Sequence, residues 1–329
     1  MGSGEGYGLC STAFFAFSYF LSIMVLLSVF SLLFSLWTCL PWTQDTKTLQ
    51  ENSTPSVRVL DSSNRLPQGV VCAAADAAEV QRLLADKSLK TPLDFARKFL
   101  GRPYVAATLE VSDPEQVVVN LQGLDCATLV ETSQALAMTR REGKTDVASY
   151  TRNLEKIRYF DGKNRGYTSR LHYLSFWMAD LTKRKVAKEV LLPQALTQPL
   201  EIRLNYMSTH AGSYPFLKNH PERVREIAQL ERKYSGKVGR FLPKSNAGLS
   251  RQQLGAIHDG DIITVVTQKA GLDYSHQGIA FWGNDGKLHM LHASSERKRV
   301  IADERTLEDY LKRISHAKGI RVFRIINKG

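Results

Sequence analysis

The feature that most constrains the fold is a run of short β-rich segments near the end of the chain. They are GDIITVVTQ, SHQGIAFWG, KLHMLHASS, KRVIA and GIRVFRII, with one helix-like segment, TLEDYLKRI, before the last. Their composition and the turn residues between them are typical of successive antiparallel strands. Helical spacing dominates the residues before this run, as in DAAEVQRLLADK and TPLDFARKFLG. Helices followed by an antiparallel run predict a domain of the α+β class.

A second distinctive feature is an uncharged apolar stretch at the start of the chain. Residues 6–44 contain no charged side chain, and residues 13–40 are almost continuously apolar. About 20 such residues span a bilayer, whereas a signal peptide has a basic start, a shorter apolar core and a small-residue cleavage site. We therefore expect an uncleaved membrane anchor, or less plausibly a cleaved signal, at residues 1–41. A polar linker at 42–74 and a folded domain at 75–329 would follow.

The basic charge balance of the chain, and the transport of its folded domain across a membrane that an anchor or signal implies, together narrow the possible partners. After residue 44 the chain has 44 basic and 31 acidic residues, a balance that suits nucleic acid, membrane headgroups or an acidic wall polymer. The basic residues are scattered, and no nucleic-acid motif is present. We expect no nucleic-acid partner and a location in the cell envelope, on the periplasmic or extracellular face, anchored in the inner membrane.

One cysteine stands out in the segment QGLDCATLVETSQALA. Cys126 follows Asp125, and the apolar residues after it recur at helical spacing. If Asp125 caps this helix, Cys126 lies in the first turn, where free N–H groups and the helix dipole favour an anion and lower a thiol pKa. By itself the segment leaves two interpretations open, a reactive nucleophile or a small packing residue. A disulfide with Cys72 is a further alternative, although two cysteines make no disulfide framework.

Histidines in the strand run could complete a thiol site, because a thiolate needs an imidazole and a group that orients it. Strand alternation places His276 on one face with the small residues Gly278 and Ala280, which would leave room for a cleft. His292 lies at the end of the next strand, and His289 would point to the opposite face and outward. No H-E-x-x-H pattern or third ligand accompanies them, so we expect no metal and no cofactor.

These motifs, taken in order, resemble the NlpC-type papain-like wall peptidases: a cysteine opening a helix, a histidine opening a strand and a polar residue on the next strand. The matching stretches are GRPYV, LDCATLVET, GDIITVVT, SHQGIAFW and LHASS. The chain is more similar still to one branch, the family named N-acetylmuramoyl-L-alanine amidase-like, through IRYFDG, SRLHYLSFWMAD and KGIRVFR. The resemblance covers roughly residues 75–328. It implies a papain-like α+β fold with an antiparallel sheet and a helical insertion at about 145–234.

The resemblance also implies catalytic roles. Cys126 would be the nucleophile, His276 the general base and then acid, and His292 the group that orients His276. Tyr104, in GRPYV, would stand near the oxyanion, where a phenol beside helix N–H groups can stabilise a tetrahedral intermediate.

Three further residues are candidates for binding rather than chemistry. Asp125 can face a ligand amine in relatives, although here we favour the helix cap. Arg170 and His172 would contact an acidic stem peptide or a muramyl group, since a guanidinium suits carboxylates. A surface arginine and a capping or core histidine are the alternatives.

The implied activity is that of an exported cysteine amidase acting on peptidoglycan or muropeptides, at the bond between the lactyl group of N-acetylmuramic acid and L-alanine. Sister branches cut between γ-D-glutamate and the diamino acid, which is the alternative. A non-catalytic, membrane-tethered wall-binding protein and an acyl transferase are the other hypotheses. The complete set of Cys126, His276 and His292 favours catalysis over binding alone.

Overall fold

The computed structural model describes residues 66–326, so the predicted anchor at 1–41 and most of the predicted linker lie outside the described residues. Within 66–326 no helix is both long enough and apolar enough to cross a bilayer. The end of the predicted linker belongs to the domain, because Val70–Cys72 forms strand β1. This strand pairs in parallel with β2, Val117–Val119.

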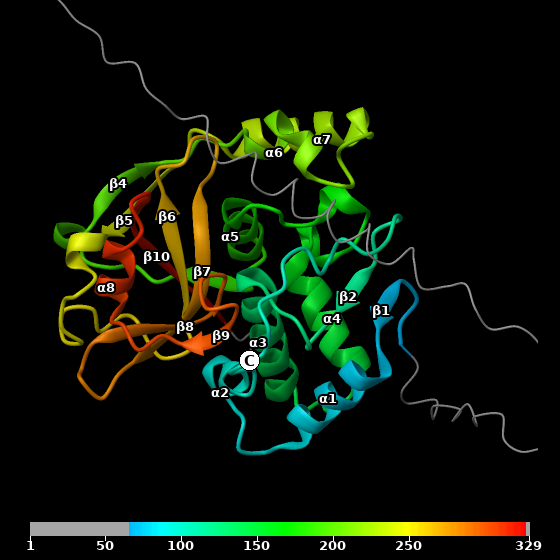
Figure 1. Ribbon diagram of the computed structural model, residues 1–329, viewed down its shortest axis with the longest axis horizontal. Coiled ribbons are helices and arrows are strands. Elements are labelled where there is room, and N and C mark those ends of the chain that lie inside the picture. The colour runs from blue at the N-terminus through cyan, green and yellow to red at the C-terminus, as the bar shows by residue number, and fades with distance from the viewer. Residues whose placement is uncertain (1–65, 327–329) are drawn as a thin grey trace, which may run out of the picture. The chain divides into compact units, whose positions relative to one another are not determined.

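A large antiparallel sheet makes up one side of the domain (Figure 1). Its strands follow the order β4-β5-β10-β6-β7-β8-β9, and β3 also pairs with β10. Their bounds are β3 Ala187–Glu189, β4 Gln198–Glu201, β5 Val238–Pro243, β6 Ile262–Thr267, β7 Tyr274–Trp282, β8 Leu288–Ser294, β9 Arg299–Ala302 and β10 Ala317–Ile325. The predicted run of strands is confirmed as β6 to β10. Strands β3, β4 and β5 were not predicted, because AKE, QPLE and VGRFLP are short and show no clear alternation.

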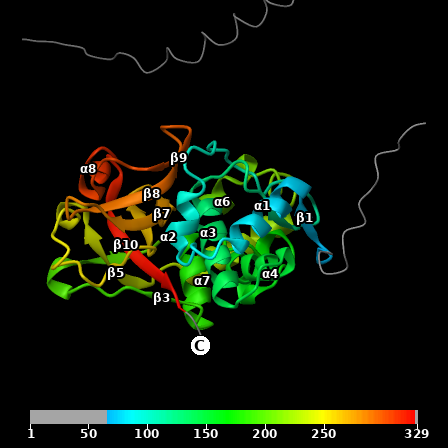
Figure 2. The ribbon, with the colours of Figure 1, turned by 90° about the horizontal axis from the view of Figure 1, so that it is seen from below.

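Helices cover both faces of the sheet. Their bounds are α1 Ala74–Ala85, α2 Pro92–Arg97, α3 Cys126–Arg141, α4 Val147–Arg158, α5 Leu174–Lys183, α6 Tyr206–Thr209, α7 Pro221–Tyr234 and α8 Leu307–Lys312. Figure 1 shows α1 to α5 gathered to one side of the sheet and α8 on the other, and Figure 2 shows the same arrangement for α1 to α4 and α8. The α+β class is therefore confirmed. The predicted helical insertion at 145–234 contains α4 to α7, but it also contributes β3 and β4 to the sheet.

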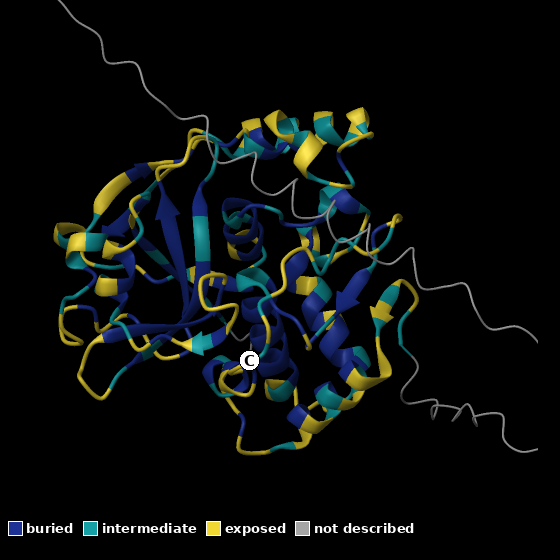
Figure 3. Cartoon of the chain, in the orientation of Figure 1, coloured by how far each residue is buried: buried dark blue, intermediate teal, exposed yellow. Residues whose placement is uncertain are grey.

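The sheet has an apolar core on each face. Along β6, Ile262 and Val266 pack toward the helices, and Ile263 and Val265 pack toward α8. All six residues of β6 are buried, and Figure 3 shows burial continuing into the neighbouring strands and α3. Side chains anchored on β7 and β8 are therefore held by a rigid, doubly covered support.

Two local features of β7 determine where its side chains point. Val265 pairs with His276 and Val266 pairs with Tyr274, so Ser275 is the extra residue of a β-bulge. Further along, a Cβ on Gly278 would lie 2.6 Å from the Cγ of Met290. The glycine is therefore required by packing. This corrects the expectation that the small residues of β7 leave room for a cleft, because Met290 fills that space and Ala280 is fully buried.

Candidate active site

The start of α3 is fixed by a capping box. The Asp125 carboxylate accepts from the N–H of Thr128 at 2.8 Å, and the Thr128 hydroxyl oxygen accepts from the N–H of Asp125 at 2.9 Å. Asp125 is therefore the helix cap that the sequence favoured. Because Asp125 is the cap, Cys126 is the first residue of the helix, and its side chain is half-buried. Cys72 and Cys126 are both free thiols, so the alternative of a disulfide between them is wrong.

The environment of Cys126 keeps its thiol protonated. Burial raises the pKa of the Cys126 thiol to about 12, and the charge of Asp125 acts in the same direction. The backbone N–H groups of Gln277, Cys126 and Ala127 act to lower it but do not prevail. The helix start acts on this pKa in the expected direction, but burial outweighs it, so the expected net lowering is wrong for the resting protein. Attack by this sulfur requires a base that removes its proton.

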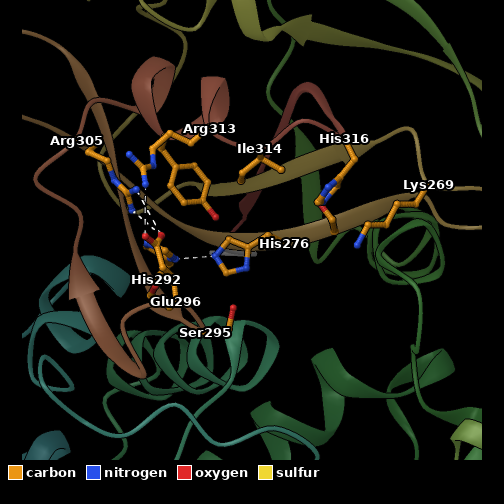
Figure 4. Close-up of a pocket in the computed structure, with 12 residues that line it drawn as sticks. Lys269, His276, His292, Ser295, Glu296, Arg305, Arg313, Ile314 and His316 are labelled. Atoms are coloured by element: carbon orange, nitrogen blue, oxygen red, sulfur yellow. Dashed lines mark hydrogen bonds and ion pairs between the residues drawn. The ribbon is translucent and has the colours of Figure 1, made fainter. Parts of the chain in front are cut away.

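The structure places the two predicted histidines in direct contact. Nε2 of His276 lies 2.7 Å from Nδ1 of His292, and the rings are nearly perpendicular (Figure 4). Burial, and then the neighbouring His292, lower the pKa of His276 to about 3, so this imidazole is neutral near pH 7. The backbone N–H of Gln277, the next residue on β7, reaches the sulfur of Cys126. His276 is thus a neutral imidazole on the strand whose backbone reaches the thiol.

An acidic residue that the sequence analysis missed adds a third member to the hydrogen-bonded pair of His276 and His292. Nε2 of His292 lies 3.2 Å from Oδ2 of Asp303, which is buried just after β9. Arg305 donates to both carboxylate oxygens, from Nε at 2.9 Å and Nη2 at 2.7 Å. Burial acts to raise the pKa of Asp303, but the hydrogen bonds from His292 and Arg305 hold it well below its usual range. The only sequence signal was an acid at the end of a strand, in RVIADER.

The charge of Asp303 assigns the protons along this line. An ionised carboxylate can only accept, so Nε2 of His292 carries a hydrogen. With a single proton on His292, its Nδ1 accepts from Nε2–H of His276. The free lone pair of His276 is then on Nδ1, where the ring can accept a proton. The line Asp303–His292–His276 therefore presents a correctly oriented base.

Two tyrosines border this group. Tyr104 is half-buried, and burial followed by the charges of Cys126 and Asp125 raises the pKa of its hydroxyl. The ring of Tyr310, on α8, packs 5.2 Å from that of His292 and 6.0 Å from that of His276. Tyr104 was predicted here, whereas Tyr310 was missed because nothing local distinguishes it from a core aromatic residue.

The structure does not offer Arg170 to a ligand. Its side chain is buried and makes ion pairs at 2.8 Å to Glu110 and 3.0 Å to Glu115. Nε2 of His172 lies 2.8 Å from the carbonyl oxygen of Tyr167, and burial lowers the pKa of His172 to about 3. Internal carboxylates therefore occupy both Nη groups of Arg170, so the structure gives no support to the prediction that it binds a carboxylate of the substrate. His172 matches its alternative, a core histidine.

His289 is excluded from the site, as expected, but it does not point outward. It is buried, stacks on Phe281 and binds Asp285 through Nε2 at 3.1 Å. Among residues 66–326 no group of His, Cys, Asp and Glu is arranged to hold a metal ion.

A cavity of about 410 Å³ opens beside the histidine pair. It is lined by residues of β7, β8 and α8 and of the loops that follow β6, β8, β9 and α8 (Figure 4). Both His276 and His292 contribute to its wall. A substrate bound in this cavity would lie directly against the candidate base.

The fold and this site define a class of protein: an α+β domain with a thiol at a helix start and a buried His–His–Asp line. Comparison with family models then gives the family. A model described as N-acetylmuramoyl-L-alanine amidase-like matches residues 94–320. Because the match covers more than half of the chain, the protein belongs to this family, as the sequence motifs predicted.

Solved structures agree with this assignment. An N-acetylmuramoyl-L-alanine amidase from Bacteroides uniformis is 38% identical, with a TM-score of 0.68, over 73% of this chain and 100% of its own. A Bacteroides fragilis protein with a provisional xylanase name is 40% identical, with a TM-score of 0.66, over 71% and 100%. A Legionella pneumophila protein, 20% identical with a TM-score of 0.58 over 77% and 95%, shares the fold. No curated protein matches the chain.

Proposed function

We propose that the protein is a cysteine amidase that hydrolyses the bond between N-acetylmuramic acid and L-alanine in peptidoglycan fragments. The observation that carries this proposal is the hydrogen-bonded line from Asp303 through His292 to His276, followed along β7 by Gln277, whose backbone N–H reaches the sulfur of Cys126. The family match and the named amidase from Bacteroides uniformis support the choice of bond. A thiol at a helix start facing a histidine on a sheet is also the arrangement of papain-like, NlpC-type enzymes.

The chemistry follows from the proton positions. Nδ1 of His276 takes the thiol proton while the sulfur of Cys126 attacks the amide carbonyl, which gives a tetrahedral oxyanion. The N–H groups at the start of α3 and the hydroxyl of Tyr104 would stabilise that charge. His276 then gives its proton to the leaving amine, the C–N bond breaks, and a thioester remains. Water attacks the thioester with His276 again acting as base, and this step releases the carboxylate and restores the thiol.

The provisional xylanase name of one relative is not carried over to this chain. Glycoside hydrolysis commonly uses two carboxyl groups that flank the bond. Among the described residues, Glu296 is the only acid that lines the cavity, and it lies near Arg305 and Arg313. Asp303 is committed to His292 and Arg305. The site therefore has a nucleophile and base suited to amides but lacks the carboxyl pair.

The test is product analysis with the full-length protein, kept in mild detergent because of its apolar start. Defined muropeptides are incubated with wild type and with Cys126→Ala, and the products are identified by mass spectrometry. Release of the intact stem peptide by wild type alone supports the amidase. A cut after γ-D-glutamate would instead support the endopeptidase, and binding without any product would support a wall-binding protein.

We also propose that residues 13–40 anchor the protein in the inner membrane, with the domain on the outer side of that membrane. The length and the lack of charge of this segment support the proposal. Full-length protein should stay with membranes after a carbonate wash, whereas the protein shortened to residues 59–329 should be released. Release of both would contradict the anchor.

A further inference from the structure

The cavity beside the catalytic histidines is strongly basic. Its wall carries the side chains of Lys269, Arg305, Arg313 and His316, against the single acid Glu296. Part of this charge is compensated internally. Arg305 lies 2.7 Å from Asp303 and 3.4 Å from Glu296, and Arg313 lies 3.8 Å from Glu296. The uncompensated positive charge therefore lies on the wall of the cavity opposite Arg305 and Arg313.

That wall is formed by Lys269 and His316, which lie close together in Figure 4. Burial, and then the charge of Lys269, lower the pKa of His316, as expected for an imidazole close to a cation. Neither side chain forms a hydrogen bond or an ion pair with an acidic group in residues 66–326. A cation and an imidazole that face a cavity without an acid between them favour an anionic ligand.

A hydroxyl group adds to this wall. Ser275 is the extra residue of the β7 bulge, it lines the same cavity, and it directly precedes His276. Its Oγ is buried and has no hydrogen-bond partner within residues 66–326. Buried polar groups are nearly always paired, so an unpaired hydroxyl on a cavity wall indicates a ligand atom that would pair with it.

The position of the cavity determines which part of the substrate enters it. His276 must protonate the leaving nitrogen, so the leaving group lies on the His276 side of Cys126. The cavity lies on that side, since His276 and His292 form part of its wall. In a muramoyl-alanine amide the lactyl carboxyl is part of the scissile bond, so the carboxylates of the substrate belong to the leaving peptide.

We infer that Lys269, His316 and Ser275 form a receptor for a carboxylate of the leaving stem peptide, such as that of its D-glutamate. This inference rests on the proposed amidase function. The receptor replaces Arg170 as the carboxylate-binding element. It selects acidic peptides by charge, and it places the leaving nitrogen against His276.

The kinetic test compares N-acetylmuramoyl-L-alanyl-D-glutamic acid with its diamide, which lacks both carboxylates. Wild-type protein should show a KM about tenfold lower for the diacid, the scale of one charge-assisted hydrogen bond. Lys269→Met should raise the KM for the diacid by about tenfold, leave kcat within twofold and leave the diamide unaffected. Lys144→Met is the matched control, an exposed lysine beyond the far end of α3, roughly 24 Å along the helix axis from Cys126. Equal effects of Lys269→Met on both substrates, or no effect on either, would overturn the receptor.

Binding separates a failure of the receptor from a failure of the amidase. In the Cys126→Ala protein, calorimetry should give about tenfold tighter binding of the diacid than of the diamide, and Lys269→Met should remove the difference. If this preference holds but wild type cleaves neither compound, the receptor stands and the amidase does not. Cleavage of both compounds with equal KM, and no preference in binding, would refute the receptor and leave the amidase.

Discussion

Replacing Asp303 by asparagine tests the proton assignment on which the mechanism depends. The carboxylate can only accept the hydrogen on Nε2 of His292, whereas an asparagine amide can also donate to that nitrogen. If it donates, the hydrogen of His292 moves to Nδ1, which then donates to Nε2 of His276. The remaining hydrogen of His276 must then sit on Nδ1. The base would therefore present a hydrogen to Cys126 where it must present a lone pair.

The size of the effect follows from the role that is lost. A well-placed general base contributes about 10²–10⁴-fold to rate, so kcat/KM of Asp303→Asn should fall by that range. KM should change little, because Asp303 is buried behind His292 and does not line the large cavity. The lost charge also leaves Arg305 less well paired, which should cost about 1–3 kcal/mol of unfolding free energy.

The assay is release of stem peptide at pH 7, with denaturant unfolding measured on the same samples. Asp285→Asn is the matched control, since Asp285 binds His289 at 3.1 Å as Asp303 binds His292, but His289 is outside the site. That variant should keep activity within twofold. If Asp303→Asn is folded and retains more than half of the wild-type kcat/KM, the assigned proton positions are refuted.

Three further substitutions test individual contacts. Arg170→Met leaves Glu110 and Glu115 without their buried partner, so the free energy of unfolding should fall by about 3–5 kcal/mol while KM stays constant. A raised KM in folded protein would restore Arg170 as a substrate contact. Tyr104→Phe should lower kcat by about 10²-fold without changing stability, and an unchanged kcat would remove the hydroxyl from the oxyanion site. His172 has a folded pKa of about 3, below its unfolded value near 6.5. Its stabilising contribution is therefore complete above pH 6.5 and is lost at about 1.4 kcal/mol per pH unit as the pH falls toward 3. His172→Gln should show a shallower loss of unfolding free energy between pH 6.5 and 4, and equal slopes would contradict the burial of a neutral imidazole.

The parts that sequence predicted correctly are those with local signals. The strands from β6 to β10 are β-rich segments bounded by turn residues, and β6 to β9 pair in chain order through short connections. Asp125 and Thr128 form a cap within one turn, so the position of Cys126 at a helix start could be predicted without a tertiary contact. The contact between His276 and His292 needed only adjacent strands and the correct faces.

What the sequence could not supply depends on contacts between distant segments. Asp303 becomes the third member of the line only because β9 pairs with β8 and returns it to His292. Arg170 has the same residue type whether it binds a ligand or Glu115, which lies 55 positions earlier in the chain. The thiol pKa was misjudged for the same reason. A helix start is visible in sequence, but the burial that outweighs it comes from packing of α3 against β7.

The protonation state of the resting site gives a last prediction. Burial disfavours both the thiolate of Cys126 and the imidazolium of His276, so the pair rests uncharged and forms charges only as the carbonyl is attacked. Alkylation by iodoacetamide, which requires the thiolate, should therefore be slow at Cys126 near pH 7 and rise continuously up to pH 10. Peptide mapping by mass spectrometry reads Cys126 and Cys72 in the same sample, and Cys72, with a pKa raised to about 11, should follow a similar curve. A rate at Cys126 that is already high and flat between pH 6 and 9 would mean a standing thiolate–imidazolium pair. The His–His–Asp line would then stabilise an existing imidazolium rather than orient a neutral base.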